Sequence, residues 1–152
     1  YQPTSIEELE RHKDHFSVII AHASFLFLLI LIRELIKDLE NLKGDLANNY
    51  HTIPVFYGEN WSKRISTVLT ILTLVPVYIL IELYDVGYMD IYFYSSLIVL
   101  LFFLLLLWQS NNKTHYIRLH NILKFLIVAG VFCIVLINPS VLWHGKNWLL
   151  KQ

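Results

Sequence analysis

Three carboxylates and one amide share one face of a predicted helix, immediately after an apolar stretch. Glu34, Asp38, Asn41 and Asp45 are spaced i, i+4, i+7 and i+11. At about 100° per residue, the four side chains fall within roughly 60° of one another. Acids at a membrane boundary are costly to hold without a counter-charge, and carboxylate oxygens are ligands that Mg²⁺ prefers. The spacing therefore favours a site for a divalent cation that carries a phosphorylated ligand.

The bulk composition predicts the element that positions these acids. The chain has 152 residues, of which 56% are hydrophobic and only 16% are charged. Apolar stretches long enough to cross a bilayer, or nearly so, cover residues 16–36, 65–84, 91–108 and 117–137. Uninterrupted apolar runs such as 97–107 favour helices, because the strands of a membrane barrel alternate in polarity. We therefore predict an all-α, polytopic transmembrane protein with four spans, for which the lipid bilayer is the first partner.

The distribution of charge predicts which side of the membrane carries the acids. The formal net charge is zero, so the chain as a whole favours no polyanion, and we expect no nucleic-acid partner. The loops 38–64 and 109–114, which lie on the same side of the membrane, carry seven lysines and arginines together with their flanks, against four on the opposite side. The positive-inside tendency then places the loop 38–64 on the cytoplasmic face.

Several local signals predict how the helices begin, bend and end. A capping box that begins at Thr4 or Ser5 favours a short surface helix before the first span. Pro76 predicts a kink in the second span. Pro54 and Gly58 favour a short loop over residues 52–58. Lys63 lies beside Trp61 and Arg64, a combination that is typical of a membrane–water interface.

The string Asp38-Leu-Glu-Asn-Leu-Lys-Gly-Asp45, followed by His-Thr-Ile-Pro-Val-Phe-Tyr-Gly at 51–58, resembles a known motif. It is similar to the second aspartate-rich motif of the UbiA superfamily of intramembrane prenyltransferases. The four predicted spans also resemble the last four of the nine helices in that family. The resemblance implies that residues 1–152 are the C-terminal part of one membrane-embedded prenyltransferase domain.

The resemblance also implies a reaction, a cofactor and a set of residues. Members transfer a polyprenyl group from its diphosphate to a hydrophobic acceptor, with Mg²⁺ between the diphosphate and aspartates. By likeness of position, Asp38 and Asp45 would be the catalytic metal ligands. Glu34 is a further candidate for metal and diphosphate, and Asn41 would hydrogen-bond a metal-bound water. Lys124, early in the last span, is a candidate for contacting the diphosphate, although a lysine that extends to the interface is the alternative.

The first aspartate-rich motif of that family, Asn-Asp-x-x-Asp-x-x-x-Asp, is absent from the 152 residues. We therefore expect this chain to supply half of the metal and diphosphate site and to need the missing N-terminal half of the same fold. The acceptor stays open between a glycerol-phosphate precursor of ether lipids and an aromatic quinone precursor. A different reading also stays open, in which the chain is a non-enzymatic membrane module, such as a transporter fragment or assembly subunit, and its acids form only a solvated helix end with ion pairs.

Overall fold

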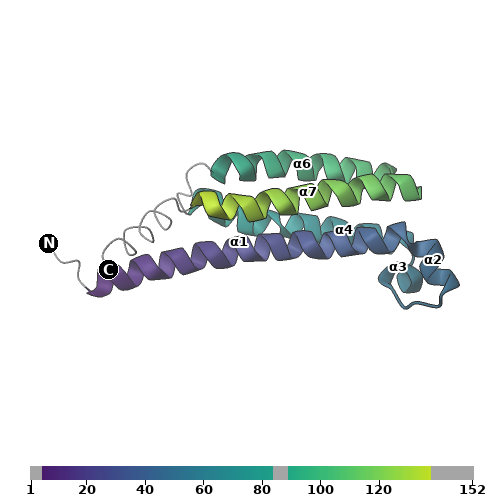
Figure 1. Ribbon diagram of the computed structural model, residues 1–152, viewed down its shortest axis with the longest axis horizontal. Coiled ribbons are helices and arrows are strands. Elements are labelled where there is room, and N and C mark those ends of the chain that lie inside the picture. The colour runs from purple at the N-terminus through teal and green to yellow at the C-terminus, as the bar shows by residue number, and fades with distance from the viewer. Residues whose placement is uncertain (1–4, 84–88, 138–152) are drawn as a thin grey trace, which may run out of the picture.

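The computed structural model describes residues 5–83 and 89–137, with side chains described as far as 134. Long helices lie side by side along one axis, and two short helices lie at one end (Figure 1). The helices in chain order are α1 (Ser5–Glu40), α2 (Leu42–Ala47), α3 (Ile53–Tyr57), α4 (Glu59–Leu72), α5 (Leu74–Glu82), α6 (Met89–Gln109) and α7 (Lys113–Ile137).

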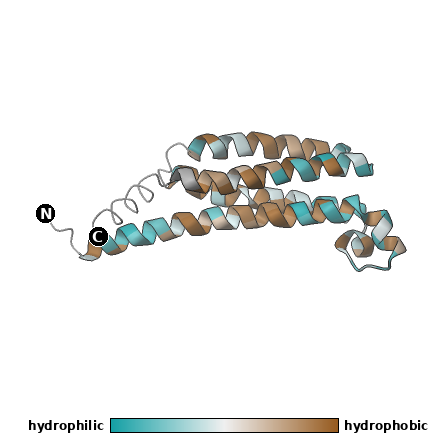
Figure 2. Ribbon diagram, in the orientation of Figure 1, coloured by the Kyte–Doolittle hydropathy of each residue, from teal (hydrophilic) through white to brown (hydrophobic). Residues whose placement is uncertain are grey.

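Four helical segments of the described chain are long and apolar enough to cross a membrane. They are α1, the pair α4–α5 taken as Glu59–Glu82, α6, and α7 from Lys113 to Ile134. Their middle parts are hydrophobic, and polar residues gather towards the ends of α1 (Figure 2). The predicted all-α fold with four membrane spans is thus confirmed, although the predicted end of the second span, Tyr84, lies outside the described residues.

The first helix is longer than predicted. Helix α1 runs without interruption over 36 residues, about 54 Å at 1.5 Å per residue. The expected short surface helix before the span is therefore wrong as a separate element. The physical reason is that no glycine or proline occurs between Ser5 and Glu40, so the polar segment continues the helical hydrogen bonding into the apolar one.

The second span is interrupted where the proline predicts it. Helix α4 ends at Leu72 and α5 begins at Leu74, with Thr73 between them. Pro76 has no N–H to offer the carbonyl of Leu72 and its ring crowds that carbonyl, which confirms the predicted kink. Buried small residues on α4, including Ser62, Ser66 and Thr70, allow the helix to lie close to α1.

Helices α1 and α7 make the most extensive contact within the bundle. Buried His22 lies with Nε2 3.2 Å from the Gly130 carbonyl oxygen. Tyr92 of α6 donates to the Leu126 carbonyl oxygen at 2.8 Å. A Cβ added at Gly130 would lie 2.6 Å from the Tyr92 hydroxyl and 2.7 Å from Leu26 Cδ2. Glycine is therefore required here for close packing of three helices, and polar contacts fix their register.

The end of the bundle that carries the acids has more structure than predicted. Residues 53–57, expected in a loop, form the short helix α3. Pro54 lies in its first turn, where a missing N–H costs nothing, and Gly58 ends it with a φ of 86°. The two turn-forming residues thus bound a helix. Helices α2 and α3 lie at the same end of the bundle as the α6–α7 turn (Figure 1).

Candidate functional site

The acidic segment contains a bend that preserves the helical pattern. Helix α1 ends at Glu40, Asn41 is a single turn residue with φ −95° and ψ 4°, and α2 follows. The Asn41 N–H donates to the Lys37 carbonyl at 3.1 Å, and the Asp45 N–H donates to the Asn41 carbonyl at 2.9 Å. Both hydrogen bonds keep the i→i−4 pattern, so the chain keeps turning by about 100° per residue through the bend.

The acidic face points away from the four-span core. The inner face of α1 is formed by buried apolar side chains that include Ile32, Ile36 and Leu39. Glu34 lies two residues from Ile36 and hence about 160° around the helix from it. Asp38, in contrast, lies about 60° from buried Leu35, at the edge of the inner face. Asp38 is half-buried and Glu34 is exposed. The outer face of α1 therefore carries the acids, while its inner face packs on α4, α5 and α7.

Asp38 lies beyond the apolar stretch 16–36 and has a perturbed carboxyl group. Partial burial raises the pKa of Asp38, and the negative charges of Asp45 and Glu34 raise it further, while Lys37 acts in the opposite direction. Two like charges therefore act on one half-buried carboxylate. A bound cation would relieve both the repulsion and the desolvation.

Asp45 is tied to the segment that follows it. The Thr52 hydroxyl donates to Asp45 Oδ2 at 3.4 Å. Thr52 is the N-terminal capping residue of α3, and α3 packs against both α1 and α2. This contact orients one carboxylate oxygen and leaves the acceptor capacity of the other available for a ligand.

The other residues predicted for the site have different surroundings. Glu34 forms ion pairs with Arg33 at 2.7 Å and Lys37 at 3.7 Å, so basic neighbours compensate its charge. Lys124 is exposed on α7, a helix that packs on the inner face of α1. The structure thus brings Asp38 and Asp45 near each other and does not bring Lys124 to the acidic face.

Asp38 and Asp45 are suited to hold Mg²⁺ together with ligands from outside this chain. No group of three or more histidine, cysteine, aspartate or glutamate side chains is placed to hold a metal ion anywhere in residues 5–83 and 89–137. Mg²⁺ is usually bound by one or two carboxylates, with waters and substrate phosphates as the remaining ligands. Asp38 and Asp45 fit that partial role and would leave ligand positions for phosphate oxygens.

A concave surface, distinct from the acidic face, lies beside the same bend. We call it the lysine groove. Its lining comes from the α1–α2 bend, from the start of α4 and from the α6–α7 turn, and it consists of Leu39, Glu40, Asn41, Leu42, Lys43, Gly44, Glu59, Asn111, Asn112, Lys113 and Tyr116. Neither Asp38 nor Asp45 belongs to this lining. The bend therefore separates an acidic face from a groove of mixed charge.

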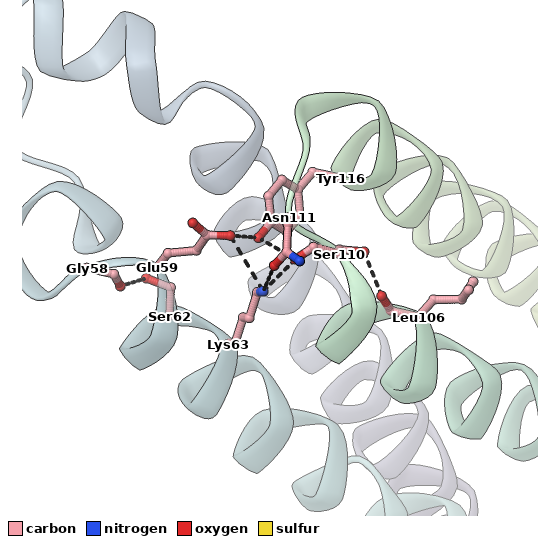
Figure 3. A network of polar contacts seen from close by, with 8 residues as sticks. All are labelled: Gly58, Glu59, Ser62, Lys63, Leu106, Ser110, Asn111 and Tyr116. Atoms are coloured by element: carbon pink, nitrogen blue, oxygen red, sulfur yellow. Dashed lines mark hydrogen bonds and ion pairs between the residues drawn. The ribbon is translucent and has the colours of Figure 1, made fainter.

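A buried lysine contacts residues that line the groove (Figure 3). Lys63 is only 4% exposed, and its ammonium donates to the carbonyl oxygen of Ser110 and lies 3.5 Å from both Asn111 Oδ1 and Glu59 Oε1. Tyr116 donates to the same carboxylate oxygen of Glu59. The acceptors of Lys63 thus lie within the protein, and its place at the membrane–water interface stays a prediction. Its spacing of i, i+4 from Glu59 is a sequence signal that could have indicated one of these contacts.

The comparisons with known proteins agree with this architecture. The model of the UbiA prenyltransferase family matches residues 13–128. A digeranylgeranylglyceryl phosphate synthase of Methanosphaera stadtmanae is 33% identical over 69 residues, which cover 44% of this chain and 25% of that protein. The synthase of Methanopyrus kandleri is 46% identical over 55 residues, 34% of this chain and 20% of that protein. The synthase of Saccharolobus solfataricus is 40% identical over 57 residues, 38% of this chain and 20% of that protein.

These alignments cover a quarter or less of the length of the relatives. No solved structure shows a significant match to the chain. The family match covers most of the chain and includes the acidic bend, the α3 segment, two of the four spans in full and most of the other two. The apolar helices and this match together make the chain an integral membrane protein, and it belongs to the UbiA prenyltransferase family.

Proposed function

We propose that residues 1–152 form the C-terminal part of a prenyltransferase domain that transfers a polyprenyl group from its diphosphate to a glycerol-phosphate lipid. The printed name of the relatives, digeranylgeranylglyceryl phosphate synthase, supports this acceptor class over an aromatic quinone precursor. In this reaction the acceptor hydroxyl loses its proton and bonds to the first prenyl carbon, and the bond from that carbon to the diphosphate breaks.

The observation that carries the proposal is the pair Asp38 and Asp45 on the outer face of the bend. Asp38 is half-buried; this burial raises its pKa, and the charges of Asp45 and Glu34 raise it further. Asp38 and Asp45 would hold Mg²⁺, which when bound neutralises the leaving diphosphate. Thr52 orients the Asp45 carboxylate, and Asn41 would hydrogen-bond a metal-bound water.

The same face of α1 also suits a prenyl chain. Leu31, Phe27 and Ile20 precede Asp38 by 7, 11 and 18 residues and hence lie within about 20° of it around the helix. All three side chains are exposed on the bundle. An acidic end followed by an exposed apolar row within one helix face matches a ligand with an anionic head and a long hydrocarbon tail.

We further propose that the missing N-terminal half of the fold covers this outer face and supplies the remaining metal ligands. Two carboxylates form an incomplete diphosphate site, and the first aspartate-rich motif is absent from the sequence. The excess of lysine and arginine on the same side supports a cytoplasmic location for the bend.

The test uses the full-length protein in membranes and measures Mg²⁺-dependent prenyl transfer to a glycerol-phosphate ether lipid. Asp38→Asn and Asp45→Asn should each reduce the rate at least a hundredfold, in line with loss of one strong electrostatic stabiliser. Glu10→Gln, an exposed acid at the other end of α1, is the control and should keep the rate. Normal transfer by both aspartate variants would reject the proposal and favour a solvated acidic helix end.

A further inference from the structure

The lysine groove carries two glutamates whose charges are already engaged by internal partners. Glu40 Oε2 lies 3.3 Å from His120 Nδ1 of α7. Glu59 Oε1 accepts the hydroxyl of Tyr116 and lies 3.5 Å from the buried Lys63 ammonium. Each carboxylate therefore already has a polar partner within the protein, and the groove does not resemble a second metal site.

The two lysines that line the groove have no such partners. Lys43, from the bend, and Lys113, at the start of α7, are both exposed, and neither forms an ion pair with any residue that the structure describes. An ammonium group offers three donors and suits phosphate oxygens. Two cations without an ion pair, contributed by two different elements to one groove, therefore favour an anionic ligand.

The amide groups of the groove add hydrogen-bond donors. Lys63 holds Asn111 through its Oδ1 oxygen at 3.5 Å, which leaves the two N–H donors of that amide for another partner (Figure 3). Asn112 and Asn41 also belong to the lining. A Cβ added at Gly44 would meet no atom within 4 Å, so the wall beside Lys43 is open. The groove thus presents ammonium and amide donors around open space, as a phosphate group requires.

We infer that the lysine groove binds the phosphate monoester head of the lipid acceptor, with Lys43 and Lys113 as its main contacts. The inference rests on the proposed function, which requires an acceptor with a phosphate head as well as a donor with a diphosphate. The two anionic groups fit two different surfaces. Asp38 and Asp45, on the outer face, can meet a diphosphate only through a metal ion, whereas the groove offers cations directly. Asn41, at the bend, lies between the two surfaces.

The test measures equilibrium binding to the full-length protein in detergent, with two probes that differ only in the phosphate: a glycerol-phosphate ether lipid and the corresponding alcohol. In the double variant K43Q/K113Q, the affinity for the phosphate lipid should fall on the order of tenfold, as expected for two lost charge-assisted contacts. The affinity for the alcohol should not change. The double variant K43R/K113R, which keeps both charges, should restore most of the binding.

Arg64→Gln is the matched control, because Arg64 lies at the same end of the bundle, stacks on Trp61 and is absent from the groove lining. It should bind both lipids as the unaltered protein does. An equal loss for both lipids in K43Q/K113Q, or no loss for either, would overturn the inference. A loss of prenyl diphosphate affinity in place of the lipid phosphate affinity would also overturn it, since the lysines would then serve the donor.

This design separates the inference from the proposed function. Selective phosphate-lipid binding without any prenyl transfer would leave the groove assignment standing and remove the transferase proposal. Prenyl transfer with an unchanged Michaelis constant for the acceptor in K43Q/K113Q would leave the transferase proposal standing and remove the groove assignment.

Discussion

Lys63 and Ser110 are joined by a hydrogen bond from a buried ammonium to a backbone carbonyl, across 47 positions of sequence. The carbonyl belongs to the turn between α6 and α7, and the lysine belongs to the first half of the second span. Glu59 and Asn111 complete the surroundings of the ammonium. One cation thus fixes the ends of three helices beside the acidic bend.

We expect Lys63→Met to destabilise the protein by about 2 kcal/mol, because the buried Ser110 carbonyl loses its donor and the partly exposed Glu59 carboxylate loses its cation. The measurement is the midpoint of unfolding in detergent as a function of denaturant. Arg64→Met, the neighbouring exposed cation, should change that midpoint little. A shift of the same size in both variants would contradict a specific role of Lys63.

We expect two glycine substitutions to act in opposite directions. Gly130→Ala should destabilise the bundle by about 1–3 kcal/mol, since the new methyl group overlaps the Tyr92 hydroxyl and Leu26. Gly44→Ala has open space around it and should be neutral or stabilising by up to about 1 kcal/mol, because alanine favours helix. Thermal unfolding of both variants in one detergent is the measurement. Equal midpoints for the two variants would contradict the packing of α1, α6 and α7 described above.

Local composition was enough to predict the spans and the acidic face. Each span depends on a continuous apolar stretch, and the helical spacing of Glu34, Asp38 and Asp45 is a property of a single segment. The proline kink in the second span is likewise local. The family resemblance rested on adjacent strings, and the match over residues 13–128 bears it out.

Contacts between segments that are distant in the chain could not be predicted from the sequence. The burial of Lys63 depends on Ser110 and Tyr116, which only the packing of α4 against the α6–α7 turn brings to it. The short helix α3 was missed because Pro54 and Gly58 are common in loops as well as at the two ends of a helix. The direction of the acidic face relative to the core also required the bundle itself.

We expect the charge of Asp38 to make stability fall as pH rises when no metal is present. The pKa of Asp38 in the folded protein is raised above its ordinary value of 3.8, so the folded state holds that proton more tightly than the unfolded state. The stability that this proton contributes is present below about pH 4 and is lost as pH rises through the folded pKa. Asp38→Asn should remove this part of the pH dependence, as measured by the unfolding midpoint between pH 4 and 7.

Addition of Mg²⁺ at pH 7 gives the matching control for that titration. It should stabilise the unaltered full-length protein and have a much smaller effect on Asp38→Asn, because a ligand stabilises in proportion to its binding to the folded state. The same pH dependence in both proteins, together with equal stabilisation by Mg²⁺, would show that the Asp38 carboxylate neither causes the pH dependence of stability nor binds the cation.

The contact between Thr52 and Asp45 gives the last prediction. Thr52→Val removes the hydroxyl that orients Asp45 Oδ2 and keeps the shape of the side chain. We expect the Mg²⁺ concentration for half-maximal prenyl transfer to rise about three- to tenfold, a loss of the size of one ordinary hydrogen bond. Thr52→Ser, which keeps the hydroxyl, should stay within about twofold of the unaltered protein on the same scale. A lower maximal rate with an unchanged Mg²⁺ requirement would mean that Thr52 supports α3 and has no part in orienting the carboxylate.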